Sequence, residues 1–128
     1  MISKSRIKYI KSLGLKKNRN SENAFVAEGP KVVGDLLERM PARMIVATTE
    51  WLKVNRHSCE NTGSEIIEVS DEELRKVSFL QHPQEVLAVF KKMENHFRTD
   101  DVGRNLALAL DDVQDPGNLG TIIRIADW

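Results

Sequence analysis

Short apolar runs alternate with helix-like segments along most of this chain, and that alternation restricts the folds open to it. We expect strands at 25–27, 43–47, 65–69 and 86–90, and helices at 4–13, 30–40, 49–54 and 71–77. Pro30 suits the first position of its helix, and Ser70 with Glu73 predicts a capping box. Strands that alternate with helices predict an α/β fold, with helices packed on a sheet.

Positive charge is concentrated at the N-terminus of a chain whose formal net charge is zero. Residues 1–20 carry +7 and no acid, whereas residues 21–128 carry −7. The basic side chains are Lys4, Arg6, Lys8, Lys11, Lys16, Lys17 and Arg19. This asymmetry is typical of proteins that bind a polyanion, but on charge alone a solvated helix face explains it equally well.

The N-terminal segment divides into a helix and a polar stretch. Ser3 is expected to cap the helix at 4–13, along which Lys4, Lys8 and Lys11 form a stripe. The stretch KKNRNSEN, residues 16–23, has no apolar periodicity and is expected to be a loop.

Composition argues against several classes of protein. No run of about 18 apolar residues occurs, so we expect no membrane-spanning segment. The N-terminus lacks the apolar region of a secretory signal, and the single cysteine, Cys59, fits a reducing cytoplasm. Structural zinc needs four ligands, and His57 with Cys59 does not supply them, so we expect no metal site.

A different pattern follows the polar segment 94–104, which is expected to be a linker. The apolar run 106–110 predicts a central parallel strand covered on both faces. A tight turn at Asp-Pro-Gly, with Gly117 tolerating positive φ, then leads into a helix that includes 121–126.

Two polar residues stand out on that last helix. Asn118 is expected to cap its start, where exposed N–H groups attract anions, and Arg124 is expected nearly two turns on, close to the same side. Taken alone, these residues favour a simple interpretation, in which Asn118 caps the helix and Arg124 pairs with a surface acid.

The complete string around Asn118 and Arg124 favours a functional interpretation instead. Asp115-Pro116-Gly117-Asn118-Leu119-Gly120-Thr121, followed by Arg124, resembles the first signature motif of the SpoU (TrmH) branch of the SPOUT RNA methyltransferases. The resemblance implies that Asn118 and Arg124 belong to a catalytic site that methylates a ribose 2′-hydroxyl. A guanidinium is a poor general base at neutral pH, so we expect Arg124 to stabilise the incipient alkoxide and position a phosphate.

Upstream segments resemble the substrate-binding domain of the same family, which is similar in fold to kink-turn-binding ribosomal proteins. They are Lys17–Arg19, the string FVAEG at 25–29, the helix at 30–40 and the string HPQEVLAV at 82–89. Relatives more often carry glycine where Glu85 stands, so a different local turn is expected. Glu28 is expected to accept hydrogen bonds from the start of the helix at Pro30.

The resemblance divides the chain into three parts. Residues 1–93 are expected to form an RNA substrate-binding domain, a small mixed-sheet α/β sandwich; residues 94–104 form a linker, and 105–128 begin an incomplete α/β-knot methyltransferase domain. Lys4, Lys8, Lys11, Lys16, Lys17 and Arg19 are the predicted contacts to structured rRNA or tRNA.

Two further family motifs, which bind S-adenosylmethionine and form the knot, are absent from the sequence. The 128-residue chain is therefore expected neither to bind that cofactor nor to catalyse. The parent enzyme is expected to do both and to dimerise through its catalytic domain. Two alternatives remain: a stand-alone RNA-binding module, and a plain α/β interaction domain whose basic block is only solvated.

Overall fold

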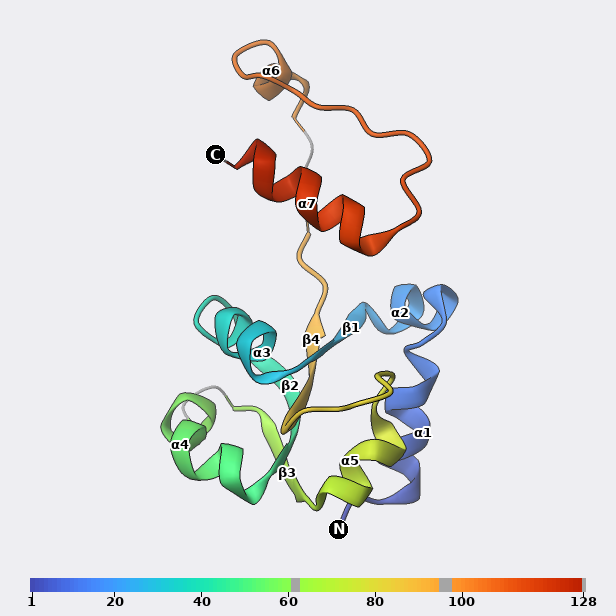
Figure 1. Ribbon diagram of the computed structural model, residues 1–128, viewed down its shortest axis with the longest axis vertical. Helices are drawn as coiled ribbons and strands as arrows, with labels where there is room; N and C mark the ends of the chain where they lie inside the picture. Colours follow the sequence, from blue (N-terminus) through green and yellow to red (C-terminus); the bar gives the residue numbers. More distant parts are fainter. Residues whose placement is uncertain (61–62, 95–97, 128) are drawn as a thin grey trace. The chain divides into compact units, whose positions relative to one another are not determined.

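The computed structural model describes residues 1–60, 63–94 and 98–127, and divides into two compact units, Met1–Met93 and Glu94–Trp128 (Figure 1). The elements of the first unit are α1 (Lys4–Ser12), α2 (Lys16–Glu22), β1 (Ala24–Glu28), α3 (Pro30–Leu37), β2 (Ala42–Thr48), α4 (Thr49–Glu60), β3 (Glu65–Val69), α5 (Asp71–Val77) and β4 (Val86–Lys91). The second unit contains α6 (Thr99–Val102) and α7 (Pro116–Ala126).

The four strands form one mixed sheet in the order β1-β4-β2-β3. β4 pairs antiparallel with both β1 and β2, whereas β2 and β3 are parallel and are joined through α4. The last strand of the unit therefore lies inside the sheet. The predicted α/β fold is confirmed, and the four strands predicted within residues 1–93 are all present.

Helices cover both faces of the sheet, with α1 and α5 on one side and α3 and α4 on the other (Figure 1). Alternate residues of β4 point to opposite faces, as the pleat requires. Leu87 and Val89 pack with the core of α1 and α5, whereas Ala88 and Phe90 pack with the core of α3 and α4. The ring of Phe90 also stacks on Phe25 of β1, at a centroid distance of 5.7 Å.

The predicted capping box at the start of α5 is confirmed. Ser70 Oγ accepts a hydrogen bond from the backbone N–H of Glu73, and the Glu73 carboxylate accepts one from the backbone N–H of Ser70. The same carboxylate accepts a bond from the Ile2 backbone N–H at 3.1 Å. The Ser70 N–H is the main reason that the pKa of Glu73 lies below its usual value.

The expected loop at 16–23 is wrong, because residues 16–22 form the helix α2. Polar side chains that bond to the end of α1 stabilise this helix, whereas no apolar face of its own is buried. The Asn18 amide donates to Ser12 O at 2.9 Å, and the Arg19 guanidinium donates to Leu13 O and Gly14 O at 3.0 and 2.8 Å. These bonds satisfy carbonyls at the end of α1 and hold the next turn in place, which apolar periodicity does not reveal.

Two helix boundaries also differ from expectation. α3 ends at Leu37 rather than at residue 40, since Pro41 disfavours helical backbone at the residue before it. α4 continues past the predicted end at residue 54 to Glu60. Cys59, in this added part of the helix, is fully buried against the sheet and so favours the longer helix.

The second unit departs most from expectation. The run 106–110 forms no strand, and Leu106, Leu108 and Leu110 are exposed. A strand exists only where a neighbour accepts and donates its backbone hydrogen bonds, and no described segment of this unit does so. α7, by contrast, begins earlier than expected, at Pro116.

Replacing Ser70 by alanine should lower the free energy of unfolding by about 1 kcal/mol, because the first turn of α5 loses its side-chain acceptor. Urea denaturation of the 128-residue chain measures this loss. Ser70→Asp keeps an acceptor and is the matched control, expected to stay within a few tenths of a kcal/mol of the parent. Equal stability of Ser70→Ala and the parent would contradict the capping role.

Candidate functional site

The string 115–124 begins α7, and its capping residue is not the expected one. Asp115, not Asn118, is the N-cap: its carboxylate accepts the backbone N–H of Asn118 at 2.7 Å. Gly117 lies in the first turn and does not have positive φ. A Cβ at 117 would lie 3.1 Å from Asp115 Oδ2, a tight contact with the capping carboxylate that glycine avoids. The Asn118 side chain is thus exposed and not used as a cap.

Arg124 is exposed on the same continuous helix, six residues beyond Asn118. At 3.6 residues per turn, six residues place the two side chains about 120° apart around the axis, so the expectation that they share one side is wrong. Arg124 lines a cavity together with Leu108, Ile122 and Asp127 of its own unit. A ligand held by both side chains would have to reach around the helix.

The predicted RNA contacts fall into two groups. Lys4, Lys8, Lys16 and Lys17 are exposed. Lys11 is also exposed, but its Nζ donates to Ser78 O at 2.5 Å and lies 4.9 Å from the centre of the Phe79 ring. Arg19 is half-buried and bonded to the end of α1. Lys11 and Arg19 therefore hold parts of the fold together.

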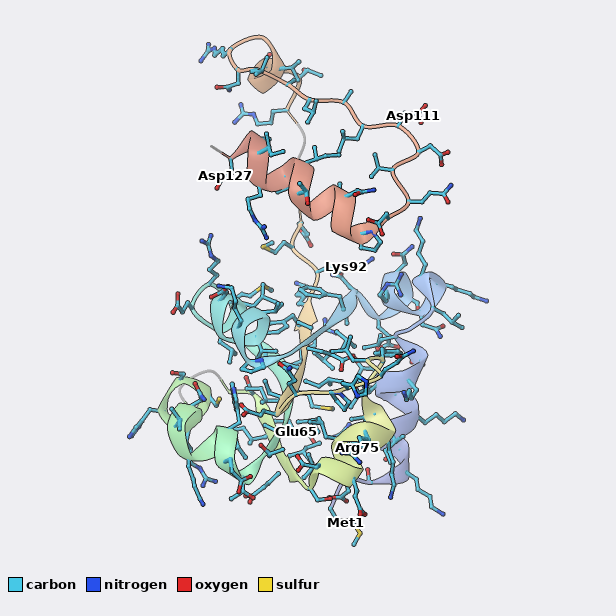
Figure 2. All side chains as sticks on the ribbon, viewed as in Figure 1. Met1, Glu65, Arg75, Lys92, Asp111 and Asp127 are labelled. Carbon is cyan, nitrogen blue, oxygen red and sulfur yellow. The ribbon has the colours of Figure 1, made fainter. Side chains whose placement is uncertain are left out.

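Two further cations lie beside α2 that no local sequence pattern singles out. The Arg43 guanidinium donates to Glu22 O at 2.9 Å, and Lys92 Nζ donates to Asn20 Oδ1. Figure 2 shows Lys92 just beyond the end of β4. We name Lys16, Lys17, Arg43 and Lys92 the α2 cationic cluster. Arg43 and Lys92 are far from α2 in the sequence, which is why their bonds to this helix are visible only in the folded chain.

Glu28 has a different partner from the one expected. Its carboxylate accepts hydrogen bonds from Ser78 Oγ and from the Phe79 backbone N–H, the latter at 2.8 Å. The start of α3 is capped by Gly29, at φ 93°, without a side-chain acceptor. Glu28 thus ties the end of β1 to the segment after α5 and does not serve the helix that follows it.

Glu85 lies directly before β4, at φ 50°, in the left-handed region that favours glycine. Its carbonyl accepts the Thr48 backbone N–H at 2.8 Å, and this bond holds the strained residue in place. The backbone at this position therefore has a geometry suited to glycine although a glutamate stands there.

Replacing Glu28 by glutamine should destabilise the first unit by about 1–2 kcal/mol, because a charged acceptor of two hydrogen bonds becomes a neutral amide with one acceptor oxygen. Thermal and urea unfolding measure the change. Glu38→Gln, an exposed carboxylate at the end of α3, is the control and should leave stability nearly unchanged. If both variants unfold alike, the Glu28 bridge contributes nothing.

Comparison with known proteins decides the family. Residues 4–88 match the model of the MRM3-like substrate binding domain. The chain belongs to this family. It therefore corresponds to the N-terminal substrate-binding domain of MRM3/RlmP-like SpoU/TrmH RNA 2′-O-methyltransferases, which confirms the resemblance found in the sequence.

Two curated relatives are similar over most of the chain. The 23S rRNA (guanosine(2553)-2′-O)-methyltransferase RlmP of Bacillus subtilis is 31% identical over 122 residues, which are 95% of this chain and 47% of that protein. The human mitochondrial rRNA methyltransferase 3 is 30% identical over 115 residues, covering 84% of this chain and 27% of that protein. The chain thus spans half or less of the length of these relatives.

Solved structures agree on the fold. A TrmH-family protein from Porphyromonas gingivalis matches the whole chain at 33% identity with a TM-score of 0.74, and the match covers 49% of that protein. An rRNA methyltransferase from Sinorhizobium meliloti, solved with bound AdoMet, matches 74% of this chain and 36% of that protein at 23% identity and a TM-score of 0.64. The second match supports the fold alone.

The apolar cavity of the second unit does not suit S-adenosylmethionine. It is lined by Leu106, Ala107, Leu108, Ile122, Ile125 and Ala126. The amino and carboxylate groups of that cofactor need polar or charged partners, which these side chains do not offer. Among the described residues, no group of three His, Cys, Asp or Glu side chains is arranged to hold a metal, and no helix is long and apolar enough to cross a bilayer.

Proposed function

We propose that this chain is the RNA-recognising part of an S-adenosylmethionine-dependent rRNA ribose 2′-O-methyltransferase. The observation that carries the proposal is the match of residues 4–88 to a substrate-binding domain of this family. The names of both curated relatives, which specify rRNA methylation, support rRNA as the substrate. The chain then contributes substrate binding, and transfer of the methyl group takes place in a methyltransferase domain.

RNA binding rests on the basic N-terminal segment. Lys4, Lys8, Lys16 and Lys17 are exposed and able to neutralise phosphates, with release of counterions from the RNA. Lys11 and Arg19 act indirectly, by holding the segment after α5 and the helix α2 in place. With few aromatic residues in the chain, recognition of folded RNA by shape is favoured over base stacking.

Catalysis rests on Asn118 and Arg124. Their place in the string 115–124 supports a role in methyl transfer, with Arg124 stabilising negative charge on the 2′-oxygen and positioning a phosphate. S-adenosylmethionine supplies the methyl group when bound to the complete methyltransferase domain, through which the parent enzyme is proposed to dimerise. Residues 94–104 are proposed as the linker between the RNA-binding domain and the methyltransferase domain.

The 128-residue chain should bind a folded transcript of the 23S rRNA region around guanosine 2553, the nucleotide in the name of the Bacillus relative, with an affinity that falls steeply as KCl is raised. Replacing Lys4, Lys8, Lys16 and Lys17 together by glutamine should reduce the slope of log Kd against log[KCl] by about 1 for each phosphate that is no longer neutralised. Filter binding between low and moderate salt measures both. No binding of the parent chain to folded RNA at low salt would instead favour a plain α/β interaction domain.

In the chain extended by a complete methyltransferase domain, Arg124→Ala should lower kcat by about 100-fold or more while leaving RNA affinity nearly unchanged. A role in stabilising charge predicts the same fold loss from about pH 6 to pH 9, whereas loss of a general base would alter the pH profile. Arg104→Ala, exposed in the same unit, is the control.

The methyl-transfer assay also distinguishes the proposed enzyme from a stand-alone RNA-binding module. The 128-residue chain by itself should transfer no methyl group from labelled cofactor, and activity from it would contradict the proposed division of labour. If the unsubstituted extended chain binds RNA but transfers no methyl group, the stand-alone RNA-binding module remains as the function.

A further inference from the structure

Arg43 and Lys92 bond to α2 at the end of the sheet where β1 begins and β4 ends. Lys16 and Lys17 begin α2, Arg43 belongs to β2, and Lys92 follows β4. Both distant residues bond to α2 itself, Arg43 through Glu22 O and Lys92 through Asn20 Oδ1. The α2 cationic cluster is therefore a product of the tertiary fold.

Arg43 reaches α2 because the strand is irregular at this point. Ala42 pairs with Phe90 and Met44 with Val89, so two consecutive partners on β4 face three residues on β2. The extra residue is Arg43, and such a bulge turns its side chain away from the regular alternation. Its guanidinium lies across the end of the sheet and donates to Glu22 O at 2.9 Å.

Lys92 is held on the same side of α2 as its two lysines. Its backbone N–H donates to Asn23 O at 3.0 Å, which continues the pairing of β4 with β1 by one residue. Its Nζ bonds to Asn20, which lies four residues after Lys16 and three after Lys17. Residues at these spacings are neighbours on a helix surface, so the three ammonium groups share one face.

The positive charge of this face is not cancelled by its internal contacts. The acceptors are a backbone carbonyl and a side-chain amide, both neutral, and each cation keeps further N–H donors for a ligand. Arg6, by contrast, forms an ion pair with Glu65 at 2.9 Å. The carboxylate that belongs to α2 is Glu22, set against five cations when Arg19 is included.

We propose that the α2 cationic cluster binds the sugar–phosphate backbone of the RNA substrate, and that this surface, rather than the outer part of α1, provides most of the electrostatic affinity. The proposal rests on the proposed function, since it names the RNA contacts of the same domain. It adds Arg43 and Lys92 to the contact residues and assigns Lys4 and Lys8 a minor part. The two tethered cations give the site a fixed geometry, which lowers the entropy lost on binding.

The test compares three pairs of substitutions in the 128-residue chain, each removing two positive charges. Arg43→Gln/Lys92→Gln should weaken binding of the folded 23S rRNA transcript by about tenfold or more and reduce the salt slope by about 2. The α1 pair Lys4→Gln/Lys8→Gln should weaken binding less than the cluster pair does. Lys31→Gln/Lys53→Gln, at exposed positions on α3 and α4, is the matched control and should change Kd by less than about twofold. Filter binding at several KCl concentrations measures both quantities.

A charge-preserving variant, Arg43→Lys/Lys92→Arg, separates charge from folding and should bind nearly as well as the parent. Lys16→Gln/Lys17→Gln, at exposed positions, should weaken RNA binding as much as Arg43→Gln/Lys92→Gln does. The lysine pair becomes the test if urea unfolding shows that Arg43→Gln/Lys92→Gln destabilises the chain. Equal weakening by the α1 pair and the cluster pairs overturns the proposal but leaves RNA binding intact. Failure of the parent chain to bind overturns the proposed function itself.

Discussion

The two hydrogen-bonded ladders of β4 hold the first unit together. β1 and β2 both pair with β4, so that without it the sheet separates into β1 and the β2–β3 pair. Residues 86–90 are at most 1% exposed, and their side chains enter the cores on both faces of the sheet. Backbone groups this deeply buried are costly to leave unpaired, so the unit closes only when β4 has taken its inner position.

That position also determines where the functional groups lie. Because β4 ends opposite the start of β1, Lys92 comes next to α2, and the bulge in β2 opposite β4 brings Arg43 to the same helix. Glu28, at the other end of the β1 pairing, is bonded to the segment that leads from α5 into β4. The surface proposed to bind RNA is thus positioned by the strand that joins β1 to the β2–β3 pair.

Sequence patterns were most reliable where apolar periodicity decides the structure. The four strands, α1 and the capping box of α5 follow from buried residues at regular spacing and from a local side-chain bond. The helix α2 was missed because polar side chains bonded to the end of α1 stabilise it. The strand at 106–110 was expected from apolarity alone, but a strand also needs a hydrogen-bonding neighbour.

The sequence by itself determined the α/β class, the family and the string that carries Asn118 and Arg124, because each depends on residue types at short, fixed spacings. Only the tertiary structure decided which cations meet. It engaged Lys11 and Arg19 in internal bonds and brought Arg43 and Lys92 beside Lys16 and Lys17. Bonds between residues so distant along the chain depend on strand order and register, which no local pattern encodes.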